Sequence, residues 1–137
     1  MSAVAIQNAL EVALAAISPA LPTAYENNSF TKPADGAAYQ EAWFLPAKPD
    51  ALEASGHWRR EQGIFQVTLK YPPKGGSAAA KARADLIQST FYHGRAIVGT
   101  GVVVQIGAPP EIGAGRNEDD RYVVPVKIPF YSNILRS

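Results

Sequence analysis

The 137-residue sequence contains no cysteine, a single methionine and only two histidines. The absence of cysteine excludes disulfides, thiolate metal sites and a cysteine nucleophile. His57 and His93 are far apart, and neither stands in a metal-binding pattern such as His-Glu-x-x-His. We therefore expect polar surface roles for both, and the sequence predicts no metal and no cofactor.

Charge is also sparse, since only 18% of the residues are charged and the formal net charge is +1. This balance argues against nucleic-acid specificity and against a disordered acidic chain. The charge is uneven, however, because residues 1–58 hold two lysines against six acids, while residues 59–83 hold six basic residues against one acid. Such patches would suit a head-to-tail oligomer, or they form an ordinary mixed surface.

Long hydrophobic runs are missing as well. The apolar N-terminal segment is interrupted by Gln7, Asn8 and Glu11, too early for a membrane span. No basic residue precedes Lys32, which argues against a secretory signal. We expect a soluble protein made in a cytoplasm, without a membrane partner. Its 47% hydrophobic content is enough for the core of one domain.

What the sequence does contain is a strong strand signal over residues 63–71. The odd positions of this stretch are apolar or aromatic and the even positions are mostly polar, which is the period of a half-buried strand. Prolines and glycines over 72–76 then end the strand, and a helix is predicted over 78–92 with Gly94 after its C-terminus. The odd positions that form the predicted inner face are Phe65, Val67, Leu69 and Tyr71.

The remaining elements follow from the same periodicities. We predict an amphipathic helix over 3–17, a short strand over 23–26 and a strand over 39–45, with long loops after the last two. The strand 39–45 has large apolar groups on both faces, so we expect the core to cover one face and a partner the other. Residues 97–106 and 121–131 are predicted to form a hairpin, with 107–120 as its long mobile tip. Because Pro125 and Pro129 lack N–H groups on one side, the last strand should be an edge or bulged there.

These elements predict an α+β fold, with a mostly antiparallel sheet of four to five strands and two helices packed on one face. The sequence contains no catalytic motif. Lys74–Ser77 has the residue types of a phosphate loop, but its glycines follow the lysine, which is the wrong order.

Two clusters are candidate contact sites. The acidic run Glu118, Asp119 and Asp120 could hold a hard cation, but three adjacent acids rarely converge on one ion, which favours a solvated loop. Trp58 with Arg59 and Arg60 could meet nucleic acid, or serve as an aromatic and arginine hot spot at a protein interface. The near-neutral net charge favours the protein interface.

The sequence resembles the tail terminator, or tail completion, proteins of long-tailed bacteriophages, including lambda-type minor tail proteins and their prophage relatives. The similarity is spread over almost the whole chain in its order, spacing and length. It lies in the N-terminal amphipathic segment, Pro22–Asn27 (PTAYEN), Trp43–Ala47 (WFLPA), Arg60–Val67 (REQGIFQV) and Tyr122–Phe130 (YVVPVKIPF).

The resemblance implies a structural protein without catalytic or cofactor residues, formed by residues 1–137 as a single tail-terminator-like α+β domain. Such proteins assemble as hexameric rings that cap the tail tube, stop its polymerisation and join the head connector. The implied partners are other copies of the chain, the major tail tube protein and the head–tail connector. The implied location is the head-proximal end of the virion tail, after assembly in the host cytoplasm.

For the interface residues we predict the two clusters named above, namely Trp58, Arg59, Arg60, Glu118, Asp119 and Asp120. Two alternatives remain open. One is another neck or head-completion protein, and the other is a small ligand-binding or enzymatic α+β domain.

Overall fold

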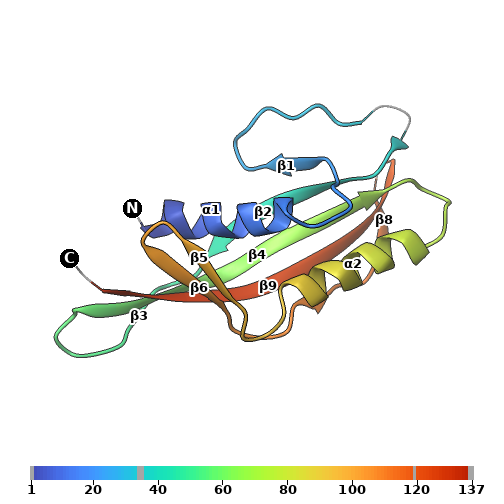
Figure 1. The fold of residues 1–137 in the computed structure, drawn as a ribbon. Coiled ribbons are helices and arrows are strands. Elements are labelled where there is room, and N and C mark those ends of the chain that lie inside the picture. Colours follow the sequence, from blue (N-terminus) through green and yellow to red (C-terminus); the bar gives the residue numbers. More distant parts are fainter. Residues whose placement is uncertain (1, 34–35, 119, 136–137) are drawn as a thin grey trace.

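Two long antiparallel strands, β4 (Trp58–Tyr71) and β9 (Arg121–Leu135), form the centre of the sheet in the computed structural model (Figure 1). They pair over the whole length of β4, from Trp58 opposite Leu135 to Tyr71 opposite Tyr122. The inner residues of the two strands meet directly, as with Phe65 opposite Ile128. The predicted strand 63–71 is therefore confirmed, and it begins five residues earlier than its alternation indicated.

The structure describes residues 2–33, 36–118 and 120–135. Within them the sheet follows the order β1-β2-β4-β9-β6-β5, while β3 pairs with β4 and both β7 and β8 pair with β9. The other elements are α1 (Ser2–Ala15), β1 (Thr23–Tyr25), β2 (Tyr39–Pro46), β3 (Asp50–Ala51), α2 (Ala78–Thr90), β5 (Ala96–Gly99), β6 (Val102–Ile106), β7 (Glu111–Ile112) and β8 (Arg116–Glu118).

One hydrophobic core lies between the sheet and the two helices. The inner stripe of α1 is buried as predicted, and so is the inner stripe of α2, whose Ala80 and Ala84 allow the helix to approach the strands closely. Phe91 at the end of α2 packs against Phe65, with ring centroids 6.2 Å apart. The buried stripe consists of Ile6, Leu10 and Leu14 within α1 and of Ile17 two residues after its end, so the helix stops earlier than the predicted 3–17.

The predicted fold class is wrong in its sheet. The described residues form nine strands instead of four to five, and the sheet is mixed because β1 pairs parallel with β2. The chain is mostly strand, and its sheet curves into a half-barrel. The missed strands β3, β7 and β8 are two or three residues long, too short to show a periodicity, and they exist because β4 and β9 offer long flanks for pairing.

The region 97–106 is a hairpin by itself. It divides into β5 and β6, which pair antiparallel on either side of a turn at Thr100 and Gly101. Gly101 has a φ of 72°, a left-handed conformation that glycine adopts at little cost. The predicted mobile tip over 107–120 also differs, because β7 and β8 hold much of it against β9.

Pro125 and Pro129 explain why the flank of β9 that faces away from β4 pairs with several short strands and not with one long strand. The carbonyl oxygens of these prolines accept hydrogen bonds from the N–H groups of Gly113 and Gly107, at 2.8 Å and 3.1 Å. The missing proline N–H groups point to the same side, away from β4. The prediction offered an edge strand or a bulge at this place. The edge is wrong, because β9 is paired on both flanks, but its outer neighbour is broken into β6, β7 and β8 around the two prolines.

None of the described helices combines the length and the apolarity needed to cross a membrane.

Gly63 gives the first test of this packing. A Cβ at this position would lie 2.4 Å from the Leu45 carbonyl oxygen and 2.9 Å from the Pro46 Cα. Because both are backbone atoms, we expect Gly63→Ala to lower the free energy of unfolding by about 1–3 kcal/mol in urea denaturation. Gly75→Ala is the control, since its Cβ would meet only the Pro72 carbonyl oxygen at 3.9 Å, and it should leave stability unchanged or slightly raised. Equal stability of the two variants would contradict this account.

Candidate interaction surfaces

Trp58, Arg59 and Arg60 begin β4 at one end of the sheet. Trp58 is exposed, and so is Leu135, which lies opposite it on β9. The Arg60 guanidinium lies over the Tyr131 ring, 4.3 Å from its centroid, and its Nε donates to Asn133 Oδ1 at 3.0 Å. Stacking and hydrogen bonding thus hold Arg60 beside an exposed indole, a combination typical of protein interfaces.

The loop between β2 and β4 projects from this same end (Figure 1). Its short strand β3 pairs Asp50 with Arg60, and residues 47–58 are exposed throughout. His57 is part of a local cluster in which its Nδ1 lies 2.9 Å from Ser55 Oγ and 3.4 Å from Glu53 Oε1. This agrees with the predicted polar surface role of His57.

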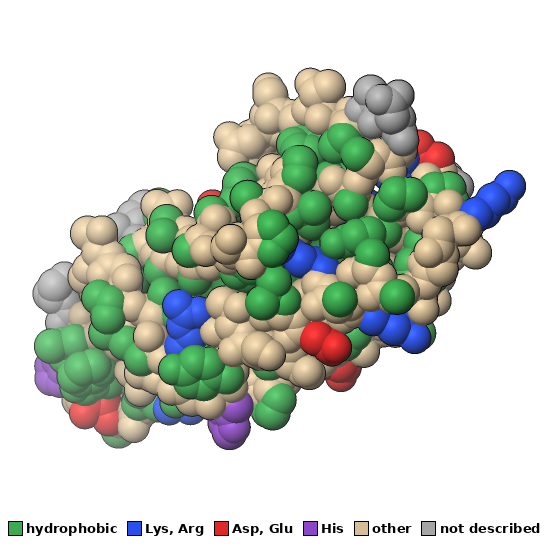
Figure 2. Space-filling view, turned by 45° about the vertical axis from the view of Figure 1, so that its right-hand side comes forward, with side chains coloured by type: hydrophobic (Ala, Val, Ile, Leu, Met, Phe, Trp, Pro, Cys, Tyr) green, Lys and Arg blue, Asp and Glu red, His purple; other side chains and the backbone are tan. Residues whose placement is uncertain are grey.

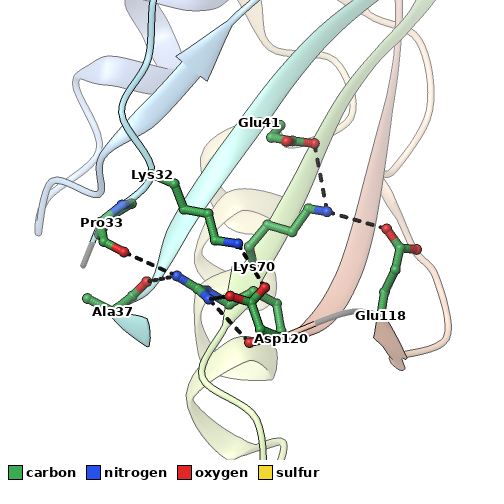
Figure 3. A network of polar contacts seen from close by, with 8 residues as sticks. Lys32, Pro33, Ala37, Glu41, Lys70, Glu118 and Asp120 are labelled. Carbon is green, nitrogen blue, oxygen red and sulfur yellow. Dashed lines mark hydrogen bonds and ion pairs between the residues drawn. The ribbon is translucent and has the colours of Figure 1, made fainter. Parts of the chain in front are cut away.

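The acidic cluster lies at the other end and is neutralised locally (Figure 3). Asp120 Oδ1 accepts from Lys32 Nζ at 2.8 Å, and Asp120 Oδ2 accepts from Arg121 Nη1 at 2.8 Å. Glu118 lies 2.8 Å from Arg116 and 3.5 Å from Lys70. These two carboxylates are therefore ion-paired, whereas Asp119 lies outside the described residues.

The ion pairs also lower the pKa values of Glu118 and Asp120. The hydrogen bond from Lys32 holds the pKa of Asp120 below its usual value, with a further contribution from Arg121. The hydrogen bond and charge of Arg116, followed by the charge of Lys70, lower the pKa of Glu118 in the same way. Both residues are carboxylates at neutral pH, and their charges are satisfied within the chain.

The two predicted clusters are not brought together. Trp58 and Tyr71 are the two ends of β4, and 13 residue steps correspond to about 40 Å along a strand. β3 and β8 accordingly lie at opposite ends of the sheet in Figure 1. The chain thus presents two chemically different ends.

The second face of β2 was predicted to be apolar, and it is. Phe44 faces the core, where it stacks on Phe130 at 5.2 Å between centroids, while Trp43 and Leu45 are each 44% exposed. Figure 2 shows the other side of the molecule, which carries the helices, and there hydrophobic side chains lie among polar ones while charged side chains stand mostly apart. A partner over the β2 face stays a prediction.

Sequence reasoning missed a groove of 1120 Å³ between α1 and β5. Val4, Asn8 and Val12 line it from the helix, and Val98 lines it from the strand. Val12 is 69% exposed and Val98 is 78% exposed, and among the described residues Arg95 is the one charged residue in the lining. The four-residue spacing of Val4, Asn8 and Val12 was a signal for this second, outer stripe of the helix.

No group of three or more His, Asp or Glu side chains that could hold a metal ion occurs in the described ranges, with Asp119 outside them.

The comparison with protein families identifies the class of protein. The family described as "Phage tail terminator protein" matches residues 5–130, nearly the whole chain. The chain therefore belongs to the phage tail terminator family, which confirms the resemblance found in the sequence. Membership assigns it to the structural components of phage tails, with a role in tail completion.

The fold recurs in a solved structure that is 28% identical in sequence. The match covers 98% of this chain and 94% of the other, with a TM-score of 0.74. The name of that protein states no function, so the match bears on the fold. Among curated proteins, none matches the chain.

The Lys32–Asp120 pair gives a pH-dependent prediction. Because the folded-state pKa of Asp120 is lowered, the pair favours folding above the unfolded-state pKa of about 4, and the contribution is lost as the pH falls through the folded-state value. Lys32→Gln should raise the Asp120 pKa toward its usual value, measured by NMR titration of the carboxyl carbon. The stability difference from the parent protein should be present at pH 7 and vanish in acid. Lys81→Gln, on the exposed side of α2, is the control, and an unchanged Asp120 pKa in Lys32→Gln would refute the pairing.

Proposed function

We propose that this protein is the tail terminator itself, which caps the finished tail tube as a ring of six copies. The ring stops addition of tube subunits and presents the surface to which the head connector binds. The family match over residues 5–130 carries this proposal. The protein acts as one domain without catalysis, assembles in the host cytoplasm and remains at the head-proximal end of the tail.

A closed ring needs two unlike surfaces on each subunit, because each copy contacts its neighbours head to tail. The two ends of the β4–β9 pair meet this requirement. We assign Trp58, Arg59 and Arg60 to one contact surface, and Glu118, Asp119 and Asp120 to the other. Since Glu118 and Asp120 are already ion-paired within the chain, apolar groups such as Trp58 and Leu135 supply most of the binding energy.

The exposed apolar surface supports assembly. The groove beside α1 and the Trp43–Leu45 face of β2 both expose apolar side chains that a neighbouring subunit could cover. The alternative role, in the neck or in head completion, would use the same surfaces for a connector and not for the tube. The two roles therefore differ in which partner is bound.

Tail tube assembly in vitro separates these roles. Tube protein polymerised in the presence of this protein should give tubes that stop growing and carry a ring of density at one end in electron micrographs. Tubes that grow to the same lengths with and without it, and lack the end density, would rule out the capping role. Binding to the connector in that case would favour the neck alternative.

Replacement of Trp58 tests the proposed contact between ring subunits. Trp58→Ala should weaken self-association by roughly 30-fold, the effect of losing a hot spot worth about 2 kcal/mol, because the indole is exposed at the proposed contact. Sedimentation velocity over a range of concentrations measures the shift from ring to monomer. Tyr92→Ala is matched to it, since Tyr92 is an exposed aromatic residue outside both surfaces, and it should leave the ring intact. A parent protein that stays monomeric at every concentration and on tubes would overturn the ring.

A further inference from the structure

The flank of β2 that faces away from β4 is only partly covered by β1. The three residues of β1 pair with residues 40–42, whereas β2 itself continues to Pro46. The second half of β2 therefore extends past the part that β1 covers. A strand that extends past its neighbour presents backbone groups on which a strand of another molecule can pair.

The hydrogen bonds of β2 show which of its backbone groups point to this flank. The Gln40 N–H donates to a carbonyl oxygen just before β1 at 2.9 Å, whereas the Ala47 N–H donates to the Gln62 carbonyl oxygen of β4 at 2.8 Å. Because the backbone groups of an antiparallel strand alternate between its two flanks, the even-numbered residues of β2 point away from β4. Beyond β1 these residues are Phe44 and Pro46.

Neither of these two residues offers a donor to another strand. Pro46 has no N–H group, and the Phe44 N–H donates to Glu26 Oε1. Glu26 directly follows β1, so its carboxylate takes the place that the carbonyl oxygen of a longer β1 would have. In the described part of the chain, this flank of β2 beyond β1 therefore has no N–H group left for pairing.

The side chains of this stretch would otherwise suit pairing between molecules. Trp43 and Leu45 are each 44% exposed, and β2 has no charged residue after Glu41. Uncharged aromatic and aliphatic side chains are typical of strands that pair from one molecule to another. Glu26 brings a charge to the same stretch, and charge is one of the means by which edge strands avoid such pairing.

We propose that Glu26 protects this edge of the sheet, because its carboxylate binds the Phe44 N–H and keeps β2 from pairing with a strand of a second copy. An incoming strand has to displace the carboxylate, which then loses a charge-assisted hydrogen bond in a partly buried place. Glu26 belongs to neither of the surfaces assigned to the ring. Its role therefore holds whether or not the ring forms.

Hydrogen exchange of the Phe44 amide, followed in ¹⁵N NMR spectra, tests the contact itself. In the parent protein this amide should exchange about 100-fold more slowly than an unprotected amide, because Glu26 accepts from it. Glu26→Ala removes the acceptor and should raise the exchange rate by about 10-fold. Glu26→Gln keeps an oxygen at the same reach and should retain most of the protection. Both variants also carry Leu45→Lys, compared with Leu45→Lys alone, so that a second copy does not cover the amide.

Sedimentation velocity tests the protective role. Glu26→Ala should form larger species than the parent protein at the same concentration, and adding Leu45→Lys should remove them, because a charged side chain opposes strand pairing. Glu53→Ala is the matched control. Glu53 also accepts from a backbone N–H, that of His57 at 3.0 Å, but in an exposed loop, so this variant has the same change of charge and should sediment like the parent.

Three results would overturn the proposal. The first is a Phe44 amide that exchanges at the unprotected rate in the parent protein. The second is an exchange rate that Glu26→Ala leaves unchanged, which would show that the carboxylate does not hold the N–H. The third is faster exchange without larger species, or larger species formed equally by Glu53→Ala, which would reject the protection of the edge.

Discussion

The hydrogen-bonded pairing of β4 with β9 is the constraint on which the rest of the structure depends. Every other strand of the main sheet is reached through these two, with β2 and β3 on β4 and with β6, β7 and β8 on β9. Both helices cover the face on which residues such as Val67 and Val126 meet. The length of the pair also fixes how far apart the Trp58 end and the Glu118 end lie. Because of this long strand pair, the two ends of the sheet lie far apart and differ in their chemistry.

The sequence predicted the parts whose pattern is local. The alternation through Phe65 and Leu69 and the helical stripe through Leu10 and Leu14 identified most of the core, because burial of one face imposes a period on the chain. The short strands could not be predicted, since a pair such as Asp50 and Ala51 has no period and pairs only because a long neighbour is available. The turn between β5 and β6 had a signal in Gly99 and Gly101, but β-branched residues on both sides obscured it.

The candidate sites show the same difference between features with a local sequence pattern and features that depend on distant residues. The exposure of Trp58 followed from its polar and basic neighbours, whereas the ion pair between Lys32 and Asp120 joins residues 88 positions apart and has no local signal. The loop before α2 was read only as a phosphate loop in the wrong order. Arg121, which lines the same cavity as this loop, is more than 40 positions further along the chain and is placed there by the fold. The family was recognised because its pattern of segments extends over nearly the whole chain.

The two prolines of β9 have a consequence for aggregation. A long strand with a continuous free flank is a template on which further strands can stack without limit. Pro125 and Pro129 each remove a donor from the outer flank, and three short strands occupy what remains. Another chain cannot extend the sheet there by continuous backbone pairing. The fold therefore protects the outer flank of its longest strand against open-ended stacking of further strands.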